Sequence, residues 1–109
     1  MRLSSYRIMW VLVMFDLPVK TSHDRRRYVQ FRRKLLQDGF VRMQFSVYTR
    51  YCPSRENAEV HAQRVERFVP ENGDVRSITI TDKQYARMRT YWGKRRRAPD
   101  PGPEQLLLF

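Results

Sequence analysis

The sequence is poor in the residues that build disulfides and metal-ligand clusters. It contains one cysteine, Cys52, and two histidines, His23 and His61. A single cysteine excludes an intrachain disulfide and is typical of proteins of a reducing cytoplasm. The spacing of the histidines groups neither of them with Cys52, so we expect this thiol to be unreactive. We expect His23 at the start of a helix and His61 on a helix surface.

Long apolar runs and glycine-rich loops are also missing. The apolar run at residues 8–15 is too short to cross a bilayer and no small-residue cleavage signal follows it. We therefore expect neither a membrane span nor a secretory signal, and a cytoplasmic location. The four glycines are isolated, which excludes a glycine loop that cradles phosphate. Paired carboxylates and a nucleophile triad are missing too, so a metal-free hydrolytic site has no evident parts.

Acidic residues are few, because 11 Asp and Glu stand against 22 Lys and Arg, which gives a net charge of +11. Arg dominates, since Lys occurs only at positions 20, 34, 83 and 94. Guanidinium groups form bidentate hydrogen bonds with phosphate, so the composition favours a polyanion as partner. Nucleic acid is favoured over an anionic membrane because no long one-sided apolar helix is evident. The alternative is that the positive charge has no binding partner and only keeps the protein soluble.

The first half of the chain predicts a buried strand followed by a helix. Residues 6–15 are apolar on both alternating sets, which predicts a strand that is buried on both faces. Thr21 or Ser22 caps the helix that follows, and Gly39 ends it. The core face of this helix is marked by Tyr28, Phe31 and Leu35.

The other predicted elements are a strand at 41–51, a helix between Pro53 and Pro70, a strand at 75–81, a turn near 82–84 and a fourth strand at 86–92. They indicate an α+β, ferredoxin-like sandwich, an antiparallel sheet with two helices on one face. This fold requires that the segment after residue 38 contains a tight bend or that the last strands complete the sheet, and the strand count stays open. Because two helices cover only one face, we expect a homodimer through the other face.

The composition changes at Lys94. Residues 94–103 combine four consecutive positive charges with three prolines and a glycine, a composition that resists regular structure. We therefore divide the chain into a ferredoxin-like domain, 1–93, and a basic, proline-rich arm, 94–109. The arm ends in Leu106, Leu107, Leu108 and Phe109. We expect these residues to add a strand to a sheet edge, on the dimer or on a partner, and a frayed tail is the alternative.

Asp16 is the best single candidate for chemistry, because it directly follows the apolar run of the first strand. A strand end places its side chain at the rim of the sheet. There a magnesium ion can be held by one or two carboxylates, with phosphate oxygens and water completing its shell. A two-fold dimer supplies two such aspartates. Alternatively, Asp16 opens a turn with Leu17 and Pro18.

The start of the first helix carries a concentrated positive charge. Six cations and no acid lie between Arg25 and Lys34, with Arg26 and Arg33 on the outward face. The helix dipole and the free amides of the first turn add to these arginines, which suits a nucleic-acid backbone better than base edges. A solvated helix face is the alternative, although positive and negative side chains usually alternate on such a face.

In combination, several of these segments resemble the CRISPR-associated Cas2 family. "LVMFDLP" is similar to the first strand of that family, which ends in aspartate, and "RRRYVQFRRKLLQDGF" to its first helix. "MQFSVYTR" resembles its second strand, and "ITITDKQYARM" resembles a segment of relatives that accompany type II systems. The resemblance covers residues 6–92.

The resemblance implies a ferredoxin-like homodimer at the centre of the spacer-acquisition complex of an antiviral defence system. It would bridge dimers of the Cas1 integrase and bind the backbone of double-stranded prespacer DNA as a ruler. The family pattern implies nucleic-acid contacts for two sets of residues, Arg25, Arg26 and Arg27, and Arg95, Arg96 and Arg97. It also implies that the terminal strand with Leu106, Leu107, Leu108 and Phe109 binds the partner.

The same resemblance implies an alternative activity, a magnesium-dependent endonuclease for RNA or double-stranded DNA. That assignment rests on Asp16 as the catalytic and metal-binding residue. A toxin-type ribonuclease of related fold would depend on turnover at the same residue. A single-stranded RNA binder would need exposed aromatics on the open sheet face, but Phe40 and Phe45 follow the first helix and so occupy the wrong strand.

Overall fold

The computed structural model describes residues 7–97, so the predicted terminal strand at 106–109 lies outside the described residues. In chain order the elements are β1 (Met9–Asp16), α1 (Ser22–Gln37), β2 (Val41–Gln44), β3 (Val47–Cys52), α2 (Arg55–Phe68), β4 (Asp74–Thr81), α3 (Asp82–Ala86), β5 (Thr90–Trp92) and β6 (Arg95–Arg97). None of the helices in this part of the chain has the length and apolar character that a bilayer crossing requires.

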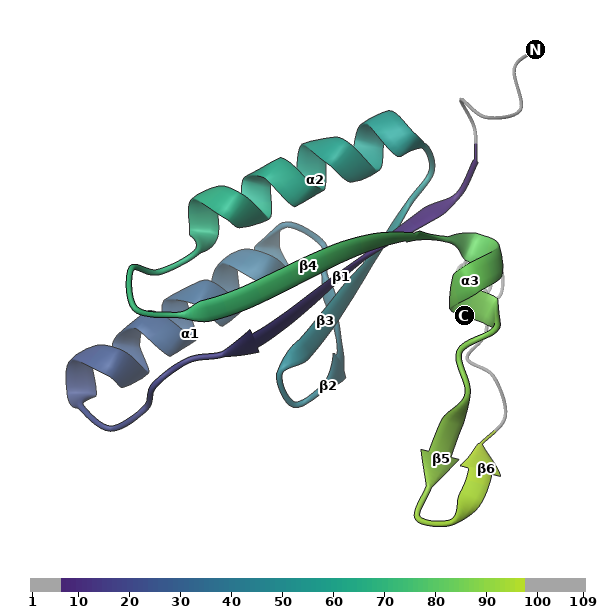
Figure 1. The fold of residues 1–109 in the computed structure, drawn as a ribbon. Coiled ribbons are helices and arrows are strands. Elements are labelled where there is room, and N and C mark those ends of the chain that lie inside the picture. The colour runs from purple at the N-terminus through teal and green to yellow at the C-terminus, as the bar shows by residue number, and fades with distance from the viewer. Residues whose placement is uncertain (1–6, 98–109) are drawn as a thin grey trace.

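The centre of the molecule is a four-stranded antiparallel sheet in the order β2-β3-β1-β4. Helix α1 connects β1 to β2, and α2 connects β3 to β4. Both helices cover the same face of the sheet (Figure 1). The structure therefore confirms the predicted ferredoxin-like α+β fold with two helices on one face.

The hydrophobic core fills the space between the helices and the sheet. On β1 the alternate residues Met9, Val11, Val13 and Phe15 belong to this core, together with residues of both helices, namely Phe31, Leu35, Ala58 and Val65. Because side chains alternate along a strand, the intervening residues of β1 point to the opposite side. We call this side, which the two long helices leave uncovered, the open face.

Local sequence signals explain where α1 begins and ends. The Thr21 hydroxyl accepts a hydrogen bond from the Asp24 amide at 3.0 Å, and the Asp24 carboxylate accepts one from the Thr21 amide. This reciprocal capping box satisfies two amides of the first turn. Gly39 has a φ of 91°, a backbone conformation that favours glycine, directly after the helix. Phe31 and Leu35 are buried, which confirms the predicted core face.

The predicted single strand at 41–51 is wrong. The segment is a hairpin of β2 and β3 that reverses at Phe45 and Ser46, and it supplies the tight bend that the fold requires. Strict alternation predicts Phe45 on the apolar side and Tyr48 on the polar side. The reversal instead leaves Phe45 70% exposed and buries Tyr48 completely in the core.

The C-terminal elements also differ from the prediction. The predicted turn near 82–84 is helix α3, which Thr81 and Gln84 open with a second capping box. The predicted fourth strand at 86–92 is shortened to β5, which pairs with β6 in a separate two-stranded sheet. Residues 95–97 therefore adopt regular structure despite their composition, because Gly93, at a φ of 63°, allows a tight turn between Trp92 and Arg95.

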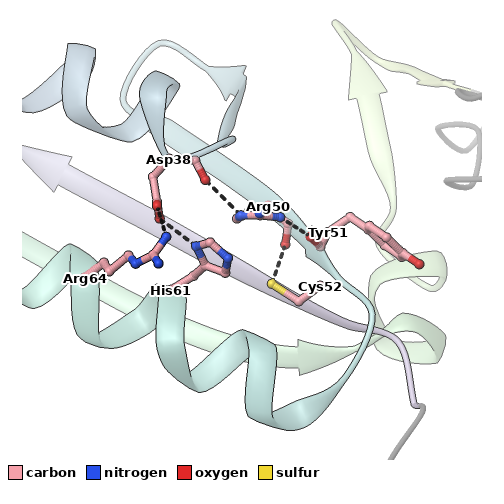
Figure 2. A network of polar contacts seen from close by, with 6 residues as sticks. All are labelled: Asp38, Arg50, Tyr51, Cys52, His61 and Arg64. Atoms are coloured by element: carbon pink, nitrogen blue, oxygen red, sulfur yellow. Dashed lines mark hydrogen bonds and ion pairs between the residues drawn. The ribbon is translucent and has the colours of Figure 1, made fainter.

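His61 is not on a helix surface, as its sequence position in a polar helix suggests, but is 5% exposed. Its Nδ1 donates a hydrogen bond to the Asp38 carboxylate at 2.7 Å, and Arg64 Nη1 donates to the other carboxylate oxygen at 2.8 Å (Figure 2). Arg50 Nε donates to the Asp38 carbonyl at 2.9 Å. This network ties the end of α1 to α2 and β3. Nearby, burial raises the pKa of the Cys52 thiol, as expected of an unreactive cysteine.

Candidate nucleic-acid and metal site

Asp16 lies at the end of β1, and its side chain is exposed on the open face. Its partner in the register of the sheet is Asp74, the first residue of β4. Directly opposed residues of an antiparallel pair share a face, with Cβ atoms about 4.5–5.5 Å apart. The structure therefore brings a second carboxylate to the predicted one. Sequence reasoning missed Asp74, which the pattern places in the turn directly before the predicted strand at 75–81, although an acid next to a strand end is a usable signal.

This pair of aspartates fits an open magnesium site rather than a closed one. Mg²⁺ keeps several waters and is commonly bound by one or two carboxylates plus the phosphates of a substrate. Within residues 7–97, no three His, Cys, Asp or Glu side chains gather in a way that could hold a metal ion. Asp74 is 3.7 Å from Arg76 Nε in a largely exposed ion pair, which contributes little energy. A magnesium ion held by these two carboxylates would complete its shell with water and phosphate oxygens.

The alternative role of Asp16 as a turn residue has no hydrogen bond to support it. An aspartate that opens a turn commonly accepts a bond from a backbone amide two residues on. Among the hydrogen bonds of residues 7–97, none involves the Asp16 side chain, and the following Leu17 is buried in the core. The carboxylate is thus free to meet a ligand.

The arginines at the start of α1, Arg25, Arg26 and Arg27, lie beside loops that position two of them. Arg25 Nη1 donates hydrogen bonds to the carbonyl oxygens of Val19 and Lys20, at 3.2 and 3.1 Å. Arg27 Nη1 donates to Asn72 Oδ1 at 3.1 Å. Arg26 is exposed, and none of the hydrogen bonds described for this part of the chain involves its side chain. The start of α1 therefore presents two oriented guanidinium groups and a free one.

The positive charge of α1 is not neutralised by neighbouring acids. The ion pairs of the described residues are His61–Asp38, Arg64–Asp38 and Arg76–Asp74, and none involves a cation of α1. Arg32 donates through Nε to the Tyr48 hydroxyl at 2.9 Å, a neutral partner that leaves its charge unpaired. The exposed cations of this helix are thus available to an anionic ligand.

The two predicted arginine sets do not form one site in a single chain. Arg25, Arg26 and Arg27 belong to the start of α1, whereas Arg95, Arg96 and Arg97 form β6. Figure 1 shows the start of α1 at one end of the molecule and the β5–β6 hairpin at the other. Any ligand that contacts both sets on one chain must be long.

The two aromatic residues considered for a single-stranded RNA binder, Phe40 and Phe45, do not lie on the strands of the open face. Phe40 is 2% exposed and lies in the core. Phe45 lies in the β2–β3 turn, where the guanidinium carbon of Arg42 is 5.1 Å from its ring centroid. Trp10 does point to the open face, but Tyr85 stacks on it with a ring-centroid distance of 3.8 Å.

Fold and site together define a class: small, basic, ferredoxin-like α+β proteins with an exposed aspartate after the first strand and unpaired arginines at the start of the first helix. The family model described as "CRISPR associated protein Cas2" matches residues 9–88. The chain belongs to this family.

Relatives match nearly the whole chain. A protein of Parvibaculum lavamentivorans is 52% identical over 101 residues, which is 93% of this chain and 100% of the relative. One of Flavobacterium psychrophilum is 48% identical over 99% of this chain and 94% of the relative, and one of Paracidovorax avenae is 42% identical over 98% and 99%. Each of these relatives carries the name "CRISPR-associated endoribonuclease Cas2".

Proposed function

We propose that this protein acts in CRISPR adaptation, where it binds the backbone of duplex DNA and bridges dimers of the Cas1 integrase during spacer acquisition. The observation that carries the proposal is the start of α1, where three consecutive arginines, Arg25, Arg26 and Arg27, have no ion pair to neutralise them. The positive end of the helix dipole adds to this charge. Contacts of this kind are independent of sequence, as a scaffold that accepts any DNA fragment requires.

The proposed assembly is a homodimer through the open face. Apolar side chains that share this face include Leu12, Met14, Val47 and Ile78, and Ile78 is 51% exposed. A second copy related by a two-fold axis would cover these side chains. It would also place two sets of the α1 arginines and two Asp16 carboxylates in one particle. Duplex DNA could then contact both subunits.

Co-purification with the integrase tests the proposed function. We expect the untagged protein to be retained with tagged Cas1 from the same CRISPR locus, and to add affinity for duplex DNA of unrelated sequences. The charge variant Arg26→Glu should keep the protein–protein contact and lose DNA affinity. Failure of the wild-type protein to bind either integrase or duplex at low salt would contradict the proposal.

A magnesium-dependent endonuclease of the toxin-like ribonuclease type is the second candidate. It is favoured by the names of the relatives and by the opposed carboxylates of Asp16 and Asp74. A magnesium ion bound there would polarise a phosphoryl oxygen of the substrate. If this activity exists, Asp16→Asn and Asp74→Asn should each abolish cleavage of RNA or DNA in magnesium, and Glu66→Gln, an exposed acid on α2, should not. Cleavage that survives Asp16→Asn excludes this candidate.

A further inference from the structure

We propose that a hollow between α1 and α2 is a second anion site, which takes the phosphate of one nucleotide unit of a nucleic-acid strand. The hollow lies on the helix side of the sheet and is therefore distinct from the open face and from Asp16. The assignment of a nucleic acid as ligand rests on the proposed function. The evidence for an anion site in the hollow is the geometry of its lining.

The walls of the hollow come from both helices. Its volume is about 260 Å³, and the last turn of α2 and the loop that follows form the side opposite α1. Three cations line it, Arg27 and Lys34 from α1 and Arg67 from α2. Glu71 is the one carboxylate among the lining residues. The balance of charge around the hollow is positive.

None of these three cations takes part in an ion pair of the described residues. Arg27 is held by its hydrogen bond to Asn72, and Lys34 and Arg67 are exposed. Gathering like charges without a counterion raises the free energy of the folded state, and a bound anion relieves that repulsion. The arrangement therefore favours a ligand with at least one full negative charge.

The rest of the lining fits a nucleotide better than a bare ion. Phe68 and Pro70 are partly exposed and Val69 is 39% exposed, so they offer an apolar wall to a sugar or base. At about 260 Å³ the hollow is smaller than the pockets of about 300–1,000 Å³ that enclose a drug-sized ligand, so a nucleotide unit would enter it only in part, phosphate first. Guanidinium and ammonium groups on two sides would then hold the phosphate.

The hollow continues the proposed DNA-binding surface. Arg27 belongs both to the three arginines at the start of α1 and to the lining of the hollow. Lys34 follows seven residues later, about 10 Å further along the helix axis. That distance corresponds to about three base-pair steps of duplex DNA. A strand bound at the start of α1 can therefore extend to the hollow.

Amide chemical shifts of the ¹⁵N-labelled protein test the hollow directly. Titration with adenosine 5′-monophosphate should move the amides of Phe68, Val69 and Glu71, with smaller shifts for inorganic phosphate. The double variant Lys34→Gln/Arg67→Gln should lose these shifts. Shifts that are scattered over the surface, or that persist in the double variant, overturn the proposal. Equal shifts with a polyglutamate peptide overturn the nucleotide assignment in favour of an acidic protein partner.

Duplex binding at several salt concentrations tests the link to nucleic acid. Lys34→Gln and Arg67→Gln should each reduce the slope of log affinity against log salt by about one. The matched controls are Lys83→Gln and Arg55→Gln, which remove the same charge from exposed positions outside both the hollow and α1. Equal slopes for hollow and control variants overturn the inference and leave the proposed DNA contact of Arg25, Arg26 and Arg27 unaffected. If the wild-type protein binds no duplex, the proposed function fails, and the amide shifts alone support or overturn the hollow.

Discussion

At the scale of single residues, Asp38 is the position on which most polar contacts converge. It terminates α1, and its carboxylate accepts hydrogen bonds from His61 and Arg64 of α2. Burial opposes the ionised form of this carboxyl, but the bonds from His61 and Arg64 outweigh burial and hold its pKa below the ordinary value. The charged form of Asp38 therefore stabilises the fold.

Replacing Asp38 with Ala should destabilise the protein by about 1–3 kcal/mol, because it leaves the buried Nδ1–H of His61 without an acceptor. Urea unfolding followed by circular dichroism measures this loss. The neighbouring variant Gln37→Ala, at an exposed position, should stay within about 0.5 kcal/mol of wild type. Equal stability of the two variants would show that the network does not contribute.

The same carboxyl gives the stability of the protein a pH dependence. Because its pKa is lower in the folded state than in the unfolded state, its contribution is fully present above the unfolded-state value, about 3.9, and is lost as the pH falls through the folded-state value. Wild-type stability should therefore decline more steeply on acidification than that of Asp38→Asn. Parallel curves would contradict this expectation.

The location of His61 shows why this network is hard to predict. Its spacing from Ala58 and Val65 is that of a core position, but a histidine in a polar helix usually lies at the surface. What makes its burial possible is a carboxylate 23 residues earlier in the chain, at the end of another helix. Such a pairing depends on how α1 and α2 pack, which periodicity does not contain.

At the scale of elements, α1 carries the proposed DNA contact, and Arg26 tests it most cleanly. Arg25 and Arg27 also hold loops by hydrogen bonds, so their replacement changes structure as well as charge. Arg26→Glu should weaken duplex binding equally for all sequences and reduce the salt slope by about one or more. Fluorescence anisotropy measures both quantities. A control is Glu59→Arg on α2, which reverses a charge at an exposed position away from the start of α1.

The elements that sequence patterns predicted well are those with local signals. α1 has a capping threonine, a core stripe and a terminal glycine, and all three lie where the pattern placed them. The β2–β3 reversal at Phe45 and Ser46 contains no glycine, proline, asparagine or aspartate. Because apolar and polar residues alternate through it, the sequence pattern predicted one continuous strand. For α3 the sequence does contain a helix-start signal, because Thr81 and Gln84 have capping-box spacing.

At the scale of the whole molecule, the proposed dimer depends on the open face. Ile78→Asp should convert the dimer to a monomer, because it places a charge among apolar side chains that a second copy would bury. Light scattering after size-exclusion chromatography measures the mass. Thr79→Asp is the matched control, because it lies next along β4 on the other face and is also exposed. A dimeric Ile78→Asp would contradict the interface.

The terminal segment is expected to add a strand within the assembled complex. Deleting residues 104–109 should leave fold and dimer intact and weaken assembly with the integrase. Replacement of Leu106, Leu107, Leu108 and Phe109 by serine, which keeps the chain length, should have the same effect. Pull-down with Cas1 measures assembly. If the truncated chain assembles with Cas1 as well as the full chain does, the terminal segment has no such role.

An integration assay tests the division of roles between charge and carboxylate most directly. Purified protein, the Cas1 integrase and a labelled duplex are combined, and insertion into a CRISPR repeat is measured for wild type, Asp16→Asn and Arg26→Glu. If this chain is a backbone-binding scaffold, Asp16→Asn should integrate as wild type does, and Arg26→Glu should lose integration together with duplex affinity. Loss of integration in Asp16→Asn, with the complex still formed on DNA and Arg26→Glu unaffected, would make Asp16 an active-site residue and contradict the scaffold role.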